Sequence, residues 1–497
     1  MREKGAAAAN YPPMAYDTLQ EYVADLECRG ELARVKEPLD PHLEISALAD
    51  LAVKAGGPAL LVEAPRGSQY PVLVNAFGTQ ERAWRAVGGA DPQEVVARLS
   101  ALLRLRPPAG LREAFSTLAR AAGVARLAPR RVAHGPCQEV VEPEPCLSSL
   151  PILHCWPEDA GRFLTLPMVF SRHPETGQRN VGMYRMQVYD ERTTGMHWHP
   201  HKVGAAHYRA YQARGERMPV AVALGGDPAL IYSATAPLPE GFDEMLLAGW
   251  LRGRRVEMVR CRTCELEVPA GAEFVLEGYV EPGELRVEGP FGDHTGYYSP
   301  PAPYPVFHLT CLTRRRQPIY PATVVGRPPM EDCYLGKITE RLFLPLLQLV
   351  LPEVVDLNLP VEGIFHNLAL VSIRKAYPGH AYQVMHALWG MGQFAFTKVI
   401  AVFDQEVNVQ DWGEAVWRLG NNIDPERDVQ LVRGPVDILN HAAPQPGFGS
   451  KMGIDATRKW PEEGFARQWP ADVTTTAQAR ERAQQAWQGI VGREAGR

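Results

Sequence analysis

The chain has 497 residues, of which 45% are hydrophobic and 22% charged, and its formal net charge is −5. This length predicts about three domains, and the composition is typical of a globular protein. Nucleic-acid binding needs a clustered basic surface. The negative balance, with no basic run longer than residues 314–316, therefore excludes a nucleic-acid partner.

No targeting or membrane segment is expected. The N-terminus, Met-Arg-Glu-Lys-Gly followed by four alanines, lacks the apolar core of a signal peptide. The most apolar run, residues 342–351, is short and contains proline and glutamine, so it predicts a buried helix. Eight scattered cysteines fit a reducing cytoplasm. Cys261 and Cys264 form one CxxC without a second pair or a nearby histidine, which favours a strand with incidental cysteines over a zinc or redox site.

The first domain is expected at residues 16–125, with an α/β fold. Capping residues, apolar runs and turn signals mark its elements. In order, they predict a helix at 40–54, strands at 59–63 and 72–75, a helix at 79–87, and a helix from Asp91-Pro92 to the prolines at 107 and 108.

The second domain, residues 126–330, has the texture of a β-sandwich or barrel. Helical periodicity fades, and short β-branched runs stand between glycines and prolines. These runs predict strands at 180–189, 219–224, 273–280 and 306–312. One helix, residues 242–251, is expected to interrupt them.

Alternation of helix and strand returns at residues 331–470, which predicts a second α/β domain with some parallel pairing. Its expected elements are a strand at 369–373, a helix at 379–388, a strand at 397–403 and a helix at 411–419. The tail, residues 471–497, should form a polar helix. Its thin apolar stripe (Ala483, Ala486, Trp487 and Ile490) is typical of a helix that docks on a neighbour, in this chain or in another subunit.

Several common catalytic motifs do not occur. There is no GxGxxG after a strand, no GxxxxGK[ST], no HExxH and no GxSxG. Classical dinucleotide binding, nucleotide hydrolysis and serine hydrolysis therefore have no support, and attention falls on the polar residues of 180–293.

Asn180, His201 and Glu244 offer an amide oxygen, an imidazole and a carboxylate. This mixed set suits Mn²⁺ or Mg²⁺ better than a structural zinc ion. Their wide separation in the sequence leaves the ordinary interpretations open: a turn asparagine, a partly exposed histidine and a helix-face glutamate.

Three histidines alternate with Trp198 and Pro200 in the segment His-Trp-His-Pro-His at residues 197–201. On a strand, all three would point to one face. They could form a metal-binding nest, but we favour one ligand with two bystanders. Lys202 follows directly and offers a point charge for phosphate.

Glu288 and Asp293 flank a Gly-Pro-Phe-Gly turn that can bring both carboxyls to one pocket. Paired carboxylates push their pKa values apart, so one can stay protonated near neutral pH as a proton donor. Arg185 would hold the other one ionised and could also grip a substrate carboxylate. The alternative is a surface turn with ordinary acids.

Five segments together resemble the UbiD family of decarboxylases. They are NVGMYR at 180–185, PEGFDE at 239–244, FVLEG at 274–278, EGPFGDHTGYY at 288–298, and GSKMGIDAT at 449–457 with KWP at 459–461. The similarity extends from residue 16 to residue 470. It implies a central split β-barrel of the flavin-reductase type between the two α/β domains.

The resemblance also implies a cofactor: prenylated FMN, supplied by a flavin prenyltransferase of the UbiX type and bound with Mn²⁺ (or Mg²⁺) and a nearby monovalent ion such as K⁺. The residues that match the family's metal ligands are Asn180, His201 and Glu244. Those that match its cofactor-binding segments are Met183, Tyr184, Arg185, His197, Trp198, His199, Lys202, Val203 and Lys398. The catalytic trio corresponds to Arg185, Glu288 and Asp293. Lys202 departs from the arginine common in quinone-pathway members, which costs the bidentate grip on phosphate.

The implied activity is decarboxylation of a hydroxybenzoate-type acid with a polyprenyl tail, in quinone assembly. The alternative within the family is a naphthoate carboxy-lyase of menaquinone assembly. Outside it, an FMN reductase or a non-catalytic homologue remains open. We expect a cytoplasmic homodimer or homohexamer, at most peripheral at the membrane.

Overall fold

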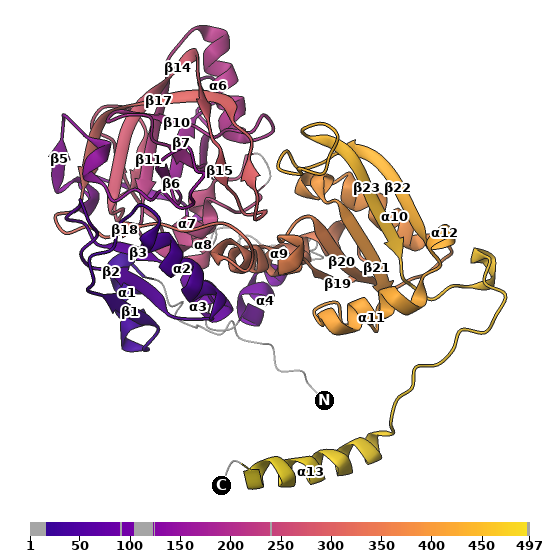
Figure 1. Ribbon diagram of the computed structural model, residues 1–497. Helices are drawn as coiled ribbons and strands as arrows, with labels where there is room; N and C mark the ends of the chain where they lie inside the picture. Colours follow the sequence, from indigo (N-terminus) through magenta and orange to yellow (C-terminus); the bar gives the residue numbers. More distant parts are fainter. Residues whose placement is uncertain (1–15, 90–91, 104–122, 124, 239–240, 495–497) are drawn as a thin grey trace, which may run out of the picture.

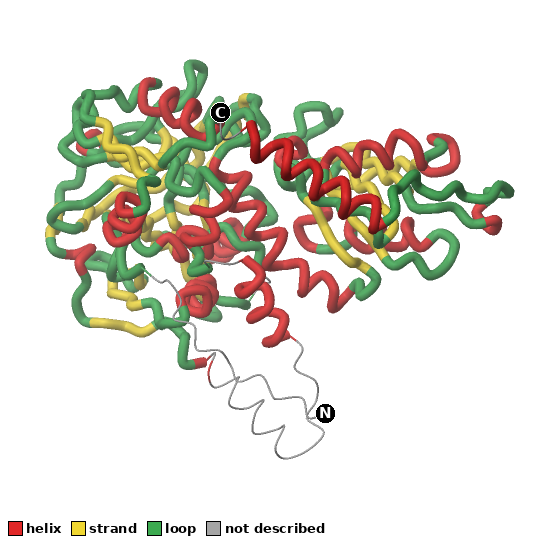
Figure 2. The backbone as a smooth tube through the Cα atoms, turned by 90° about the horizontal axis from the view of Figure 1, so that it is seen from below, coloured by secondary structure: helices red, strands yellow, loops and turns green. Residues whose placement is uncertain are grey.

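The computed structural model describes residues 16–89, 92–103, 123, 125–238 and 241–494. The expected mixed α/β fold with several sheets is confirmed (Figure 1). Figures 1 and 2 show two regions of strands with helices between them. The N-terminal elements and the central sheet make up the first region, and the C-terminal sheet makes up the second.

The N-terminal elements form a four-stranded sheet in the order β1-β2-β3-β18. Its strands and helices are α1 (Leu19–Cys28), β1 (Leu32–Val35), α2 (Glu44–Lys54), β2 (Ala59–Val62), β3 (Val72–Val74), α3 (Gln80–Ala86), α4 (Pro92–Leu103) and β18 (Tyr320–Pro321). Because β18 pairs with β3, a segment that follows the central strands completes this sheet.

Helix α2 begins four residues later than predicted. The Asp-Pro start forms a turn instead, in which the backbone N–H of His42 donates to Asp40 Oδ1 at 2.8 Å. Leu43 then takes a positive φ of 70°, which is incompatible with a helix. The strands at 59–63 and 72–75 and the helix at 79–87 are confirmed, whereas the prolines at 107 and 108 lie outside the described residues.

The central sheet has seven antiparallel strands in the order β10-β17-β14-β11-β7-β8, with β5 also paired to β17. Its strands are β5 (Val140–Glu142), β7 (Met168–Arg172), β8 (Arg179–Met183), β10 (Thr193–Gly195), β11 (Met218–Leu224), β14 (Phe274–Glu288) and β17 (Ala302–Arg314). Within the described residues the end strands β8 and β10 do not pair with each other, so the sheet is open and no closed barrel forms.

Smaller sheets flank the central one. They are built from β4 (Arg130–Val132), β12 (Glu257–Arg260) and β13 (Glu267–Pro269), from β6 (Phe163–Leu164) and β9 (Met186–Gln187), and from β15 (Phe291–Gly292) and β16 (Tyr298–Ser299). Cys261 and Cys264 lie in the turn between β12 and β13, so the expectation of a strand with incidental cysteines is wrong.

Three helices, not one, interrupt the central strands: α6 (Val203–Arg214), α7 (Pro228–Ser233) and α8 (Glu244–Arg252). Only α8 was expected. Helix α7 carries a readable start, because Asp227 caps it and Pro228 occupies its first turn. Helix α6 has no such start: its N-cap, Lys202, makes no side-chain capping bond.

The C-terminal sheet has the order β19-β20-β21-β23-β22, and the β20-β21-β23 pairings are parallel, as expected. Its elements are α9 (Glu331–Val350), β19 (Val354–Asn358), β20 (Leu368–Ile373), α10 (His380–Trp389), β21 (Val399–Asp404), α11 (Trp412–Asn422), α12 (Pro425–Asp428), β22 (Val429–Pro435) and β23 (Phe448–Asp455). Residues 342–350 of the apolar run belong to α9, and Leu351 follows the helix. Leu342, Leu347 and Leu351 are buried, but Leu349 and Val350 are 56% and 63% exposed. Among the described residues no helix is both long and apolar enough to cross a membrane.

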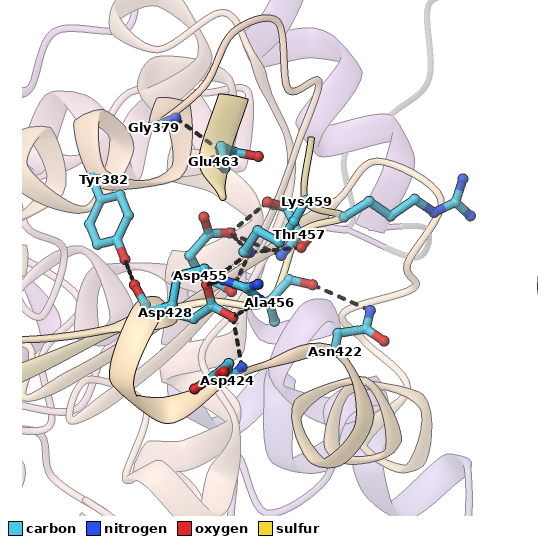
Figure 3. Close-up of polar contacts among 12 residues, drawn as sticks. Gly379, Tyr382, Asn422, Asp424, Asp428, Asp455, Ala456, Thr457, Lys459 and Glu463 are labelled. Carbon is cyan, nitrogen blue, oxygen red and sulfur yellow. Dashed lines mark hydrogen bonds and ion pairs between the residues drawn. The ribbon is translucent and has the colours of Figure 1, made fainter. Parts of the chain in front are cut away.

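Residues 449–461 contain most of β23, an inner strand of this sheet, and the loop that follows it (Figure 3). Lys459 is buried, and its Nζ donates to the carbonyl oxygens of Asp455 and Thr457, each at 2.8 Å. The same ammonium lies 2.9 Å from Asp455 Oδ1 and 3.7 Å from Asp428 Oδ1. The Lys459 ammonium therefore neutralises the buried carboxylate of Asp455 at the end of β23 and adds to the Arg427 ion pair of Asp428 at the end of α12.

The tail forms helix α13 (Ala477–Glu494) at the end of an extended segment, apart from both strand regions (Figure 1). Trp487 and Ile490 of its apolar stripe are 64% and 53% exposed. The stripe is therefore uncovered in this chain, and its docking on another subunit stays a prediction.

Candidate active site

Arg185, between β8 and β9, binds both predicted acids. Its Nε donates to Glu288 Oε1 at 3.0 Å, and its Nη1 donates a short hydrogen bond to Asp293 Oδ2. Its Nη2 donates to Ser299 Oγ at 3.1 Å, and the guanidinium lies 4.4 Å from the centre of the Phe291 ring. The structure thus gathers the three residues of the predicted trio into one buried cluster.

Local chain geometry explains this convergence. Glu288 is the last residue of β14, and Asp293 follows β15 directly. Between them Gly289 has a φ of 94°, a conformation that favours glycine, so the chain can turn back sharply. Strand β15 then pairs with β16, and this pairing brings Ser299 to the same cluster.

Asp293 is ionised in this arrangement. Burial alone would raise the pKa of Asp293, but the charge of Arg185 and the hydrogen bond from His294 outweigh burial and hold that pKa well below its usual range. Arg185 also lies between the two carboxyls, so they do not share a proton. Asp293 therefore does not meet the expectation of a donor that stays protonated near neutral pH while Arg185 binds it.

The histidines at 197–201 lie in the loop between β10 and α6, not on a strand, so they share no strand face. His197 Nδ1 is 2.7 Å from Glu288 Oε1, and its Nε2 is 2.7 Å from His199 Nε2. Burial lowers the pKa of His197 and lowers that of His199 to about 3, so both rings are neutral at neutral pH. A chain of hydrogen bonds thus runs from Glu288 through His197 to His199, and His197 is no bystander.

Two of the three predicted metal ligands are neighbours. The backbone N–H of Val181, next to Asn180, donates to Glu244 Oε2 at 3.1 Å. Burial raises the pKa of Glu244 to about 7. The side-chain amide nitrogen of Asn180 is buried without a hydrogen-bond partner among the described residues. An under-neutralised carboxylate beside an amide oxygen fits a divalent cation.

His201 stands apart from that pair. It is exposed, and its ring packs 4.9 Å from the ring of Phe396 and 5.7 Å from that of His199. In the described part of the chain, no hydrogen bond or ion pair joins His201 to Asn180 or Glu244. The structure therefore places His201 beside His199, but it does not bring this predicted third ligand into contact with Asn180 and Glu244.

The predicted cofactor-binding residues come from three segments. Met183 ends β8 and Tyr184 follows it, and Trp198 is buried with its ring against Tyr184. Lys202 caps the N-terminus of α6, which begins at Val203. Burial lowers the pKa of Lys202. A lysine at a helix N-terminus is a donor set that suits phosphate.

Lys398, just before β21, belongs to the C-terminal sheet, and its Nζ donates to Asn440 Oδ1 at 3.2 Å. Asp437 lies on the same side, where its charge acts on Lys202 and on His199. The site is therefore assembled between the central sheet and the C-terminal sheet.

Two further histidines, which the sequence interpretation did not include, are connected to Asp293. One bonds Asp293 directly, and the other bonds the first histidine. His294 Nδ1 lies 2.8 Å from Asp293 Oδ1, and its Nε2 lies 2.9 Å from His366 Nε2. His294 could have been found because it follows Asp293 directly. His366 precedes β20, 72 residues away, and no local signal marks it.

A cavity of about 190 Å³ reaches Asp293 between Trp156 and Tyr297. This is less than the roughly 300–1,000 Å³ of sites that enclose drug-sized ligands. A larger cavity, about 530 Å³, lies between α1 and the end of β17 and contains none of the predicted site residues. The charged cluster, not the larger cavity, therefore marks the candidate active site.

Three family models match the chain. They describe the N-terminal, Rift-related and C-terminal domains of 3-octaprenyl-4-hydroxybenzoate carboxy-lyase, and they match residues 23–103, 130–328 and 333–456. An uncharacterised protein of Archaeoglobus fulgidus is 51% identical over 479 residues, which cover 96% of this chain and 99% of that protein.

Solved structures are similar over nearly the whole chain. An evolved dimeric form of the UbiD-class enzyme HmfF from Pelotomaculum thermopropionicum, in complex with prenylated FMN (prFMN), is 30% identical with a TM-score of 0.76, covering 92% of this chain and 97% of that one. The vanillic acid decarboxylase of Sedimentibacter hydroxybenzoicus in its closed form is 27% identical with a TM-score of 0.82, covering 95% and 99%. Its open form gives a TM-score of 0.76 at 26% identity, covering 96% and 99%. The closed form is thus the better match, in keeping with the small cavity at Asp293.

Proposed function

This chain belongs to the UbiD family of carboxy-lyases, and from that premise we propose that it decarboxylates an aromatic carboxylic acid with prenylated FMN and a divalent metal ion. The observation that carries the proposal is the buried guanidinium of Arg185 bound to both Glu288 and Asp293. Decarboxylation requires a positive group that binds the substrate carboxylate and a neighbouring acid that carries a proton.

Prenylated FMN, when bound, supplies the sink for the electrons left behind as CO₂ departs. Lys202 with the N-terminus of α6 would hold its phosphate, joined by Lys398 from the C-terminal sheet. The segments 183–185 and 197–199, with Val203, would line the flavin. We assign the metal, Mn²⁺ or Mg²⁺, to Asn180, Glu244 and His201, with a monovalent ion such as K⁺ nearby, and the central sheet to the cofactor-binding split barrel.

Arg185 has the central part in the proton chemistry. A substrate carboxylate that binds Arg185 competes with Asp293 for the same guanidinium. Loss of that partner removes the largest influence that lowers the pKa of Asp293, so the pKa rises and the carboxyl can take up a proton from its neighbour His294. It can then deliver this proton to the ring carbon that has lost CO₂. Glu288, fixed by His197, keeps Arg185 in place throughout.

The cluster of Arg185, Glu288 and Asp293 also supports a substrate class. Glu288 Oε2 is buried and accepts no hydrogen bond within the described part of the site. It can therefore accept one from a ring hydroxyl, which supports a hydroxybenzoate-type acid. The matched family models, named for a 3-octaprenyl-4-hydroxybenzoate carboxy-lyase, support a polyprenyl tail and a place in quinone assembly. We further propose a flavin prenyltransferase of the UbiX type as cofactor supplier, a homo-oligomer that uses α13, and a cytoplasmic enzyme at most peripheral at the membrane.

The test is co-expression with a flavin prenyltransferase and Mn²⁺, followed by absorbance and mass analysis of the bound flavin. CO₂ release is then measured from hydroxybenzoates with and without a prenyl tail. We expect a flavin heavier than FMN by one prenyl unit and turnover of at least one hydroxylated acid. Plain FMN with hydride transfer and no CO₂ release would favour a reductase, and no flavin at all would favour a non-catalytic homologue.

A further inference from the structure

A second group of ligand-type side chains lies outside the site described above. Cys261 and Cys264 occupy the turn between β12 and β13, and Glu277 lies on β14 of the central sheet. One ligand atom from each of these residues lies within 4.8 Å of the other two. Cys261 and Glu277 are buried, at 5% and 0% exposure, and Cys264 is half-buried.

Glu277 holds the turn in shape from the neighbouring sheet. Its Oε1 accepts the backbone N–H of Arg262 at 2.8 Å, and its Oε2 accepts the backbone N–H of Thr263 at 2.6 Å and the Thr263 hydroxyl at 2.8 Å. Among the described residues no cation forms an ion pair with this buried carboxylate. A carboxylate and two sulfurs thus face one another without a positive charge between them, an arrangement that favours a bound cation.

The turn also holds the two cysteines together. The backbone N–H of Cys261 donates to Leu266 O at 2.9 Å and closes the loop around both thiols. Two cysteines separated by two residues in a tight turn are the usual sequence unit of a zinc-binding loop.

We propose that Cys261, Cys264 and Glu277 bind a thiophilic divalent cation of the zinc type, at a site separate from the flavin-linked metal. Two sulfurs and one oxygen suit such an ion, whereas the set of Asn180, His201 and Glu244 contains no sulfur and suits a harder one. The fourth coordination position falls to water. Binding releases the thiol protons to solvent. The ion would fasten the small β12-β13 sheet to strand β14.

The absence of sulfur from the flavin-linked set makes the proposal testable with Co²⁺ as the probe. The full-length protein is stripped of metal, kept reduced, and titrated with Co²⁺. Thiolate ligation gives a sulfur-to-cobalt charge-transfer band that the Asn180, His201 and Glu244 set cannot produce. We expect this band to saturate at one ion per chain and to disappear when Zn²⁺ is added.

Variants assign the band to residues. Cys264→Ser should abolish it, whereas the matched control Cys28→Ser, which removes an exposed thiol on α1, should leave it unchanged. Glu277→Gln keeps an oxygen for the turn but removes the charge, so the band should persist with weaker Co²⁺ affinity. The proposal is overturned if the wild-type protein shows no thiolate band, or if Cys264→Ser retains it. It is equally overturned if the mass of the untreated protein is lower by two hydrogens, because the pair would then be a disulfide.

Discussion

His366 and His294 face each other between the C-terminal sheet and the central sheet, with their Nε2 atoms 2.9 Å apart. His294 in turn bonds Asp293 at 2.8 Å. Burial alone would lower the pKa of His294, but Asp293 reverses this and raises it, whereas burial lowers that of His366 to about 4. The proton therefore resides on His294, and a residue of the C-terminal region touches the acid through one intermediate side chain.

This relationship predicts that His366 positions Asp293 without reacting itself. For His366→Ala we expect kcat to fall by about tenfold to a hundredfold, because small displacements of reacting groups cost this much. The bound flavin should be unchanged. His386→Ala, which removes an exposed ring of α10 bonded to Gln430, is the control and should retain activity. Equal kcat values for the two variants would refute the positioning role.

Asp293→Asn should abolish turnover and leave the cofactor bound. The amide preserves the shape of the side chain but cannot carry the proton, and positioned acids contribute about 10²- to 10⁴-fold to rate. Flavin absorbance after purification, together with CO₂ release, checks both halves of this statement. Near-normal turnover in the variant would show that the proton comes from another group.

Because of Glu244, we predict that the stability of the metal-free protein depends on pH. The folded-state pKa of Glu244 is raised from 4.5 to about 7. Its favourable contribution to the free energy of unfolding is therefore fully present below pH 4.5 and is lost as pH rises to about 7. The loss is about 3 kcal/mol. Urea unfolding of the metal-free protein should show this decrease between pH 4.5 and 7. Mn²⁺ should restore the stability at high pH.

In Glu244→Gln, both the decrease and the response to Mn²⁺ should disappear. Glu406→Gln, at an exposed position, should behave like the wild type. If the Glu244 variant still gained stability from Mn²⁺, that residue would not be a ligand.

Lys459→Met should destabilise the C-terminal sheet. The substitution leaves the buried carboxylate of Asp455 without its cation, whereas Asp428 keeps its ion pair with Arg427, and breaking a buried pair costs about 3–5 kcal/mol. Lys54→Met removes a partly exposed helix pair with Asp50 and should cost less than about 1 kcal/mol. Chemical unfolding compares the two, and similar losses would contradict the network shown in Figure 3.

Removal of residues 475–497 tests the role of α13. Its apolar stripe is uncovered in this chain, so the truncated chain should unfold at the same temperature as the full chain when both are dilute. Light scattering should instead show a smaller assembly at high concentration. An unchanged assembly would mean that the subunits associate through another surface.

Local signals explain how much of the fold could be predicted. β20 and β21 are buried β-branched runs between turn residues, and α11 begins at a capping aspartate, Asp411, so each was visible in the sequence. Helix α6 was hidden because its buried residues, Gly204, Ala205, His207 and Tyr208, have helical spacing but include small and polar side chains, so no apolar stripe marks them in the sequence. The open edges of the central sheet were hidden as well, because strand pairing depends on partners far along the chain.

The candidate site, like the fold, could be predicted only in part from the sequence. The grouping of Arg185, Glu288 and Asp293 was foreseen through the family resemblance, since their spacing alone also allowed a surface turn. The bond from His197 to Glu288 and the contact of His366 with His294 depend on tertiary packing, and no local pattern encodes them. The lowered pKa of Asp293 also follows from packing, because it needs Arg185 and His294 at hydrogen-bond distance.

Helix α9 gives the molecule a mechanical link between its two strand regions (Figure 1). Its first residue, Glu331, is fixed to the N-terminal elements, where it accepts the backbone N–H of Phe77 at 2.9 Å and the Thr323 hydroxyl at 2.7 Å. The helix also packs against α3, α4 and β19. One continuous helix therefore joins the N-terminal elements to β19, the strand that pairs with β20. Since His366 lies just before β20, we expect a substitution where α9 meets α3 and α4 to affect turnover although it touches no reacting atom.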